Sequence, residues 1–150
     1  MIRSRRLFVL LSRLMAPAIR HGLIRSTRLG GSLCVLRTRG RRSGRTREAA
    51  LDYATAPDGG IWVAAGWGTA TAWYRNLLAD PAVEVVCERR TWRGIAEPLS
   101  DPAERIVAIR SILLAAGFVG RAYGFDPATV PDARLAELFD AIPIIRIRRT

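Results

Sequence analysis

Apolar and polar residues alternate with a period of two from Leu33 onward, in short runs separated by turn-forming residues. This alternation predicts strands at residues 33–38, 49–55, 61–65, 83–88, 91–97 and 144–147. The sequence Pro57-Asp58-Gly59-Gly60 is a strong hairpin signal, and Arg89-Arg90 marks a second turn. Short strands joined in this way are typical of an antiparallel barrel, so the fold class we expect is α+β with a split antiparallel β-barrel.

Spacing of three or four residues replaces the alternation in four places. It predicts helices at residues 7–19, 73–78, 101–116 and 132–141. The clearest start is Asp101, an N-cap with Pro102 in the first turn and Glu104 as capping-box partner, while Thr69 or Thr71 caps the short second helix. Because no linker divides these elements, residues 1–150 are expected to form one domain, a helical segment over 1–30 and a barrel over 31–150.

Two interpretations of the basic amphipathic segment at residues 1–30 stay open. Its apolar stripe could pack on the barrel as a capping helix, or it could lie on an anionic membrane surface with its arginines toward the lipid headgroups. The uncharged apolar run at residues 7–11 is too short to span a bilayer or to serve as a signal-peptide core. The two cysteines, interpreted below as thiols of a reducing compartment, favour a cytoplasmic location, with peripheral membrane contact as an open alternative.

The net charge of +11 comes from the N-terminal third of the chain. Residues 1–47 contain 13 arginines and no carboxylate, whereas residues 48–150 contain 11 arginines against 13 carboxylates and carry −2. The chain has no lysine, which excludes Schiff-base chemistry and a phosphate-binding loop that depends on lysine. Arginine suits phosphate and carboxylate recognition, so this third is expected to meet an anionic partner.

Catalytic side chains of the usual kinds are scarce. His21 is the single histidine, and Cys34 and Cys87 are 53 positions apart, so no metal-ligand cluster and no catalytic triad is indicated. The two cysteines are interpreted as buried thiols of a reducing compartment, with a disulfide as the alternative. Any reaction would have to rely on a cofactor.

The segment Gly40–Arg47, with the sequence Gly-Arg-Arg-Ser-Gly-Arg-Thr-Arg, is the most distinctive in the chain. Glycines at both ends allow backbone N–H groups to converge on an anion, and Arg41, Arg42 and Arg47 could add charge-assisted bonds. This is the chemistry of a phosphate cradle. A solvated basic hairpin or a non-specific nucleic-acid contact are the alternatives, and nucleic-acid binding ranks last because no recognition helix or aromatic platform accompanies the loop.

Three motifs together resemble the deazaflavin-dependent nitroreductase family. They are the arginine-rich segment, then Ala64-Ala65-Gly66-Trp67-Gly68, then Trp73-Tyr74-Arg75-Asn76-Leu77 with Asp80-Pro81. The resemblance implies a split β-barrel of the flavin-reductase or pyridoxamine-phosphate-oxidase type. It also implies a reduced 8-hydroxy-5-deazaflavin (factor 420) as cofactor, whose phosphate and polyglutamate tail are anionic, with FMN as the runner-up.

The resemblance also implies which residues bind the cofactor. It assigns the phosphate and tail to the arginine-rich loop and the ring system to small residues and two helix positions: Arg41, Arg42, Ser43, Gly44, Arg47, Ala49, Ala50, Ala64, Ala65, Gly66, Trp67, Gly68, Trp73 and Asn76. Tyr74 and Leu77 are then expected to face the core. A core aromatic is the alternative for Trp73.

Hydride transfer from the reduced cofactor to a quinone, nitro compound or enone is the activity that the resemblance implies. The aromatic stretch with Phe118, Tyr123 and Phe125 is the expected wall of the acceptor site, and Tyr123 is the candidate proton donor, with a buried structural tyrosine as the alternative. A homodimer is the family expectation. The other hypothesis is a flavin- or lipid-binding module without turnover, attached peripherally to the membrane.

Overall fold

The computed structural model describes Leu10, Pro17 and residues 32–117 and 123–150 of the chain. The expected helical segment at residues 1–30 and the predicted aromatic wall at Phe118 therefore lie outside the described residues, apart from Leu10 and Pro17. No helix in the described ranges is long and apolar enough to cross a membrane.

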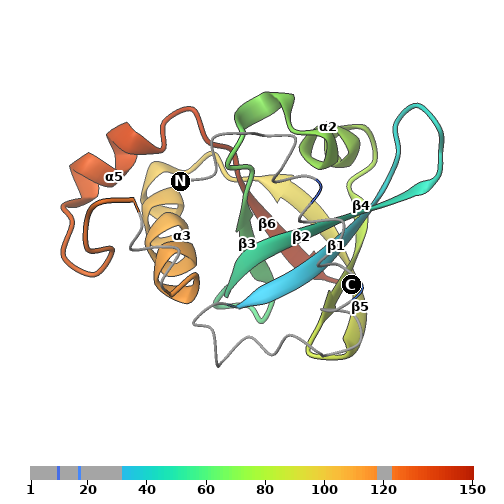
Figure 1. Ribbon diagram of the computed structural model, residues 1–150, viewed down its shortest axis with the longest axis horizontal. Coiled ribbons are helices and arrows are strands. Elements are labelled where there is room, and N and C mark those ends of the chain that lie inside the picture. Colours follow the sequence, from blue (N-terminus) through green and yellow to red (C-terminus); the bar gives the residue numbers. More distant parts are fainter. Residues whose placement is uncertain (1–9, 11–16, 18–31, 118–122) are drawn as a thin grey trace.

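Six antiparallel strands close into a barrel in the order β1-β2-β3-β6-β5-β4 (Figure 1). Their bounds are β1 Leu33–Arg39, β2 Thr46–Thr55, β3 Ile61–Ala64, β4 Ala82–Cys87, β5 Arg90–Pro98 and β6 Ile144–Arg149. The register of β1 on β2 pairs Leu33 with Asp52 and Arg39 with Thr46. The barrel and its strands confirm the fold expected from the alternation of apolar and polar residues.

Alternate residues of each strand fill the barrel interior, as the pleat of a strand requires. The interior residues are Cys34, Leu36, Leu51, Ile61, Val63, Val83, Val85, Ala96, Ile145 and Ile147. Two α2 (Ala72–Ala79) residues, Trp73 and Leu77, belong to the same cluster. The helix α2 therefore closes one end of the barrel, the end at which the β1–β2 hairpin turns (Figure 1).

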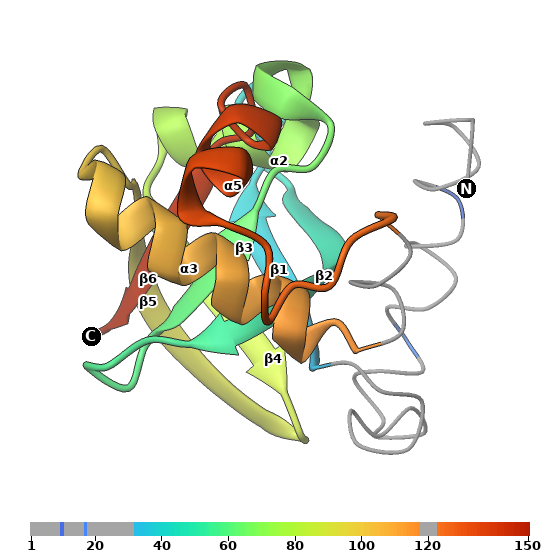
Figure 2. The ribbon, with the colours of Figure 1, turned by 90° about the vertical axis from the view of Figure 1, so that its left-hand side faces the viewer.

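A second apolar cluster lies outside the barrel, where α3 (Pro102–Ala115) covers β2, β3 and β6 and α5 (Asp132–Leu138) packs on α3 (Figures 1 and 2). Residues of α3 such as Ile109 and Leu113 pack there with Trp62 of β3 and Leu135 of α5. This face of the barrel is therefore the one closed by helices.

The start of α3 follows the sequence prediction in part. The carboxylate of Asp101 accepts a hydrogen bond from the Glu104 N–H at 2.8 Å, and Pro102 occupies the first turn. The side chain of Glu104, however, accepts from Arg146 of β6 at 3.0 Å. The cap is real, but the expected second half of the capping box is replaced by an ion pair that ties α3 to the barrel.

One turn and one helix start differ from the prediction in detail. The β4–β5 turn is formed by Glu88 and Arg89, both with positive φ, because Cys87 pairs with Arg90; the predicted turn at Arg89-Arg90 is thus wrong by one residue. Thr71 occupies the N-cap position of α2, as predicted. Its hydroxyl, however, donates to the carbonyl of Gly68 at 2.7 Å and makes no capping hydrogen bond to the helix.

The last predicted helix is shorter than expected, since α5 ends at Leu138. The Pro57–Gly60 turn is confirmed: the Asp58 carboxylate accepts from the Gly60 N–H at 3.0 Å, and Gly59 has φ of 82°.

Candidate functional site

The β1–β2 hairpin loop is shorter than the sequence suggested. Because β2 begins at Thr46, the loop consists of Gly40–Arg45 and the Arg47 side chain leaves from the strand. The loop closes on itself, with the Gly40 N–H donating to the Arg45 carbonyl and the Gly44 N–H to the Gly40 carbonyl, both at 2.8 Å. Gly44 has φ of 66°, a conformation that a residue with a Cβ adopts only with strain.

Most of the backbone amides that were expected to converge on an anion already form hydrogen bonds within the protein. Besides the two closing bonds, the Arg45 N–H points to the Ser43 hydroxyl at 3.3 Å and the Arg41 N–H to the Asn76 side chain at 3.3 Å. Four of the loop amides are therefore occupied within the protein. An anion at this loop would be bound mainly by arginine side chains, with Ser43 shaping the loop and also accepting from Arg47 Nη2 at 3.4 Å.

Asn76 of α2 joins the hairpin to the helix that closes the barrel. Its side chain is 4% exposed; the amide nitrogen donates to Thr38 Oγ1 at 3.2 Å, and the carbonyl accepts from Arg41 Nη1 at 3.0 Å as well as from the Arg41 N–H. Sequence reasoning missed Thr38, which is buried on β1. A buried polar bridge of this kind fixes the position of the loop relative to α2.

Within the described part of the chain, the arginines of the hairpin loop, of the start of β2 and of α2 have no carboxylate partner. In the described ranges, no ion pair involves Arg41, Arg42, Arg47 or Arg75. By contrast, Arg37 of β1 forms ion pairs with Glu48 and Glu84. The pKa of Arg41 lies below its ordinary value, first through desolvation and then through repulsion by Arg75 and Arg42. The cluster is thus a concentration of positive charge that an anion would relieve.

The segment Ala64–Gly68 starts at the last residue of β3 and leads toward α2, and its members have different surroundings. Ala65 is fully buried, its N–H donating to the Pro143 carbonyl at 2.9 Å, so it packs in the core and presents no surface to a ligand. A Cβ added to Gly66 would meet no heavy atom within 4 Å, and Trp67 beside it is 40% exposed. Ala64 is half-buried against the outer cluster, so the part of the segment most accessible to a ligand is Gly66 to Gly68.

The fold places Ala49 and Ala50 on opposite faces of β2 and Trp73 in the barrel interior. Ala49 packs against the barrel interior, whereas Ala50 belongs to an outer cluster with Val35 and Val86. Neighbouring residues of a strand point to opposite faces, so the prediction that both alanines flank one ring is wrong. Trp73 is 9% exposed within the interior cluster, the position of a core aromatic.

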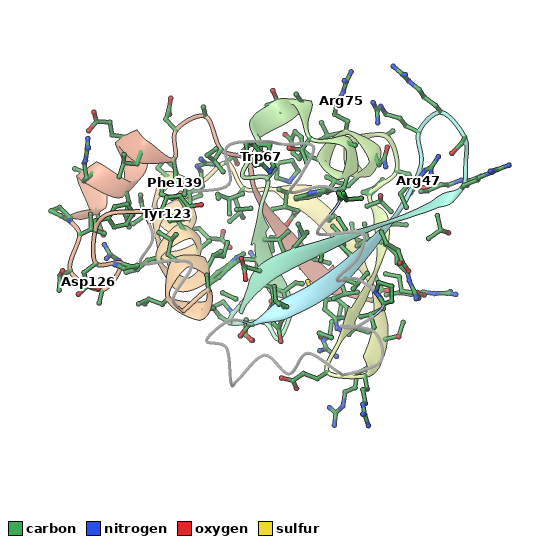
Figure 3. The ribbon with its side chains drawn as sticks, in the orientation of Figure 1. Arg47, Trp67, Arg75, Tyr123, Asp126 and Phe139 are labelled. Carbon is green, nitrogen blue, oxygen red and sulfur yellow. The ribbon has the colours of Figure 1, made fainter. Side chains whose placement is uncertain are left out.

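Tyr123 lies far from the hairpin. In Figure 3, Arg47 and Arg75 are at one side of the molecule and Tyr123 and Phe139 at the other, with Trp67 between them. Tyr123 as a whole residue is 58% exposed, so the alternative of a buried structural tyrosine is wrong, although its ring contacts Phe139, with centroids 5.8 Å apart, and its hydroxyl is partly desolvated. Desolvation of its hydroxyl, followed by the charge of Asp52, raises the pKa of Tyr123.

The described geometry thus consists of an arginine group, an open glycine segment and an exposed tryptophan at or next to the end of the barrel closed by α2. Residues 18–131, well over half of the chain, match the sequence profile of a family described as F420H(2)-dependent quinone reductase. The chain belongs to this family. As a member of the F420H(2)-dependent family, the protein is an oxidoreductase with the deazaflavin F420 as cofactor.

Several solved structures are similar to this chain in their fold. Rv2991 of Mycobacterium tuberculosis, described as a conserved hypothetical protein, is 20% identical with a TM-score of 0.61, over 79% of this chain and 73% of that one. The F420-H2 dependent reductase FDR-A is 20% identical with a TM-score of 0.55, over 78% and 94%. HutZ, the heme storage protein of Vibrio cholerae, is 14% identical with a TM-score of 0.54, over 91% and 90%. The comparison with curated proteins found no match.

The residues present fit the cofactor of the F420H(2)-dependent family. Arg41, Arg42 and Arg47 offer guanidinium groups that have no carboxylate partner among the described residues and could bind a phosphate and an acidic tail, and the absence of a side chain at Gly66 leaves space for a flat ring. Arg75, which the sequence analysis did not single out, belongs to the same charged group. Its place in the Trp-Tyr-Arg-Asn motif, directly before Asn76, is the signal that could have identified it.

Proposed function

We propose that the protein reduces an electrophilic organic acceptor, a quinone, a nitro compound or an enone, at the barrel end closed by α2. When bound, the reduced deazaflavin supplies the hydride. The observation that carries the proposal is the bridge from Thr38 through Asn76 to Arg41, because it fixes the hairpin arginines to the helix that follows the glycine segment.

In this proposal the arginines bind and orient the cofactor. Arg41, Arg42 and Arg47 form charge-assisted hydrogen bonds with its phosphate and acidic tail, and the loop that carries two of them is already ordered by its own hydrogen bonds. A loop that is ordered before binding loses less conformational entropy when the ligand arrives. The hairpin therefore contributes affinity and fixes the direction in which the cofactor lies.

Gly66 and Trp67 define the ring end of the proposed site. Gly66 leaves the space that a ring needs for close approach, and the exposed indole of Trp67 offers an apolar surface against which a planar acceptor can stack. Orientation of two reactants, more than acid–base catalysis, accounts for the rate in this proposal. Tyr123 remains the candidate proton donor, on the far side of Trp67 in Figure 3.

The experiment is steady-state oxidation of the reduced deazaflavin, followed by absorbance, with a quinone, a nitroaromatic and an enone as acceptors. We expect acceleration with at least one of the three, and a lower turnover in the Trp67→Ala variant. The Tyr123→Phe variant separates a proton donor, whose loss lowers turnover, from an acceptor wall, whose ring is retained. If none of the acceptors is reduced faster than without protein, the proposed function is wrong. Assembly into a homodimer, a cytoplasmic location and peripheral membrane contact stay predictions.

A further inference from the structure

Cys34 and Cys87 lie on neighbouring strands, at the end of the barrel opposite α2. Cys34 is the second residue of β1 and Cys87 the last residue of β4, and both are free thiols. The register of these antiparallel strands pairs Val35 with Val86. Continued by one residue, the same register sets Cys34 opposite Cys87. Strand pairing therefore brings together two cysteines that are 53 positions apart in sequence.

Both cysteine side chains are directed into the barrel. Val35 and Val86 belong together to a cluster outside it, and neighbouring residues of a strand point to opposite faces. In agreement with this alternation, Cys34 is a member of the interior cluster and Cys87 packs against that cluster. Residues opposite each other on antiparallel strands have Cα atoms roughly 4.5–5.5 Å apart, and a disulfide requires about 4.4–6.8 Å. The register therefore meets the geometric requirement for a disulfide.

Tyr53 of β2 gives a second observation that both cysteines occupy one place. Its side chain packs against the interior cluster, on the same face as Leu51, which is paired with Cys34. Desolvation, followed by the charges of Cys87, Glu88 and Cys34 and a hydrogen bond with Cys87, raises the pKa of Tyr53 to about 12. One hydroxyl is thus influenced by both cysteines, as the register requires.

We propose that Cys34 and Cys87 are a redox-active pair, which hydroperoxides oxidise to a cross-strand disulfide inside the barrel. The inference goes beyond the proposed function, because this end of the barrel is not the one that α2 and the hairpin form. A metal site is not indicated, since the described ranges contain no group of three or more histidine, cysteine, aspartate or glutamate side chains that could hold a metal ion.

The two thiols differ in access, and this difference assigns their roles. Cys34 is fully buried, whereas Cys87 is partly exposed, next to the β4–β5 turn. The thiolate of Cys87 attacks an oxygen of the hydroperoxide; the O–O bond breaks, and a sulfenic acid and an alcohol are formed. The sulfur of Cys34 then forms the S–S bond while the S–O bond breaks, and the Cys34 proton leaves with the hydroxide as water. Two electrons pass from the thiols to one hydroperoxide.

Burial of Cys34 does not oppose the product. Desolvation raises the pKa of the Cys34 thiol because it disfavours the charged thiolate. A disulfide is neutral, so the same apolar surroundings do not disfavour it. The small thiolate fraction of Cys34 slows the second step, and the fixed position of the two sulfurs on paired strands compensates by proximity.

The test treats the reduced full-length protein with hydrogen peroxide, blocks the remaining thiols with iodoacetamide and maps tryptic peptides without reduction. Residues 29–37 and 76–89 form two tryptic peptides, each with one cysteine and no methionine. We expect a species in which these two peptides are joined with the loss of two hydrogens, and which dithiothreitol separates again. The melting temperature of the oxidised protein should lie about 5–15 °C above that of the reduced protein, because the disulfide closes a long loop in the unfolded chain.

Variants that keep one thiol each are the controls. Cys34→Ala should stop at the sulfenic acid of Cys87, which dimedone traps, and Cys87→Ala should leave Cys34 reduced. Neither variant should gain stability on treatment with peroxide.

Three results would overturn the proposal. They are a disulfide that joins two chains, a Cys87 oxidised to sulfinic acid while Cys34 stays reduced, and an internal disulfide that leaves the melting temperature unchanged or lowers it. The peptide map of the wild-type protein gives the decision even where a variant does not fold.

Discussion

Gly66 provides a substitution that separates binding from folding. A Cβ added there meets no heavy atom within 4 Å, and the backbone is not in the left-handed region. Gly66→Leu should therefore change the free energy of unfolding by less than about 1 kcal/mol, and the melting temperature by less than about 3 °C. The new side chain would occupy the space that the account assigns to the cofactor ring.

The expected loss of affinity follows from the ring surface that the leucine would keep from being buried. If roughly 100 Å² of apolar contact is lost at about 25 cal/mol per Å², binding weakens by about 2.5 kcal/mol, which is more than fiftyfold. The assay pairs thermal unfolding with a fluorescence titration of oxidised deazaflavin.

Gly60 is the contrasting position, at which an added side chain should disrupt folding. A Cβ at Gly60 would lie 2.2 Å from the Ile147 carbonyl oxygen, so Gly60→Ala should lower the melting temperature severely. A Gly66→Leu variant that melts with the wild-type protein and also binds the cofactor with wild-type affinity would refute the placement of the ring at Gly66.

Two other predictions concern stability and thiol reactivity. Arg146→Met should lower the free energy of unfolding by about 1–3 kcal/mol, since it removes half-buried ion pairs, one of them to Asp58 at 3.1 Å. The Gly60 N–H, and then Arg146, hold the pKa of Asp58 below its ordinary value. The contribution of Asp58 to stability is therefore complete above about pH 4 and is lost as the pH falls further. The free energy of unfolding, measured in urea at pH 7 and pH 3, should differ less between the two pH values in Arg146→Met than in the wild-type protein. Burial raises the pKa of the Cys34 thiol, whereas Cys87 is partly exposed, so iodoacetamide should modify Cys87 first; equal rates by mass spectrometry would contradict this.

The strands and α3 could be predicted from sequence because their signals are local. Alternation marked every strand of the barrel, and Asp101 with Pro102 marked the start of α3. The β4–β5 turn was misplaced by one residue because neither Glu88 nor Arg89 is of the type that usually adopts positive φ.

The candidate site depended on contacts that local patterns do not contain. Asn76 and Arg41 are 35 positions apart, and no periodicity relates a helix residue to a hairpin loop at that separation. The pairing of Ala49 with Ala50 failed for another reason, since motif matching ignored the alternation that had predicted the strand. The resemblance located the loop, but the fold decided which of its groups are available to a ligand.

The most direct test of the central claim is a titration of the purified protein with oxidised deazaflavin and, in parallel, with FMN, repeated for Arg41→Ala, Arg47→Ala and the control Arg90→Ala, which removes the same charge at the opposite end of the barrel. The account predicts saturable binding of the deazaflavin in preference to FMN, weakened by both hairpin substitutions and unchanged by the control. Deazaflavin binding with the same affinity in all four proteins would contradict the assignment of the hairpin, and absence of binding to the wild-type protein would contradict the proposed site as a whole.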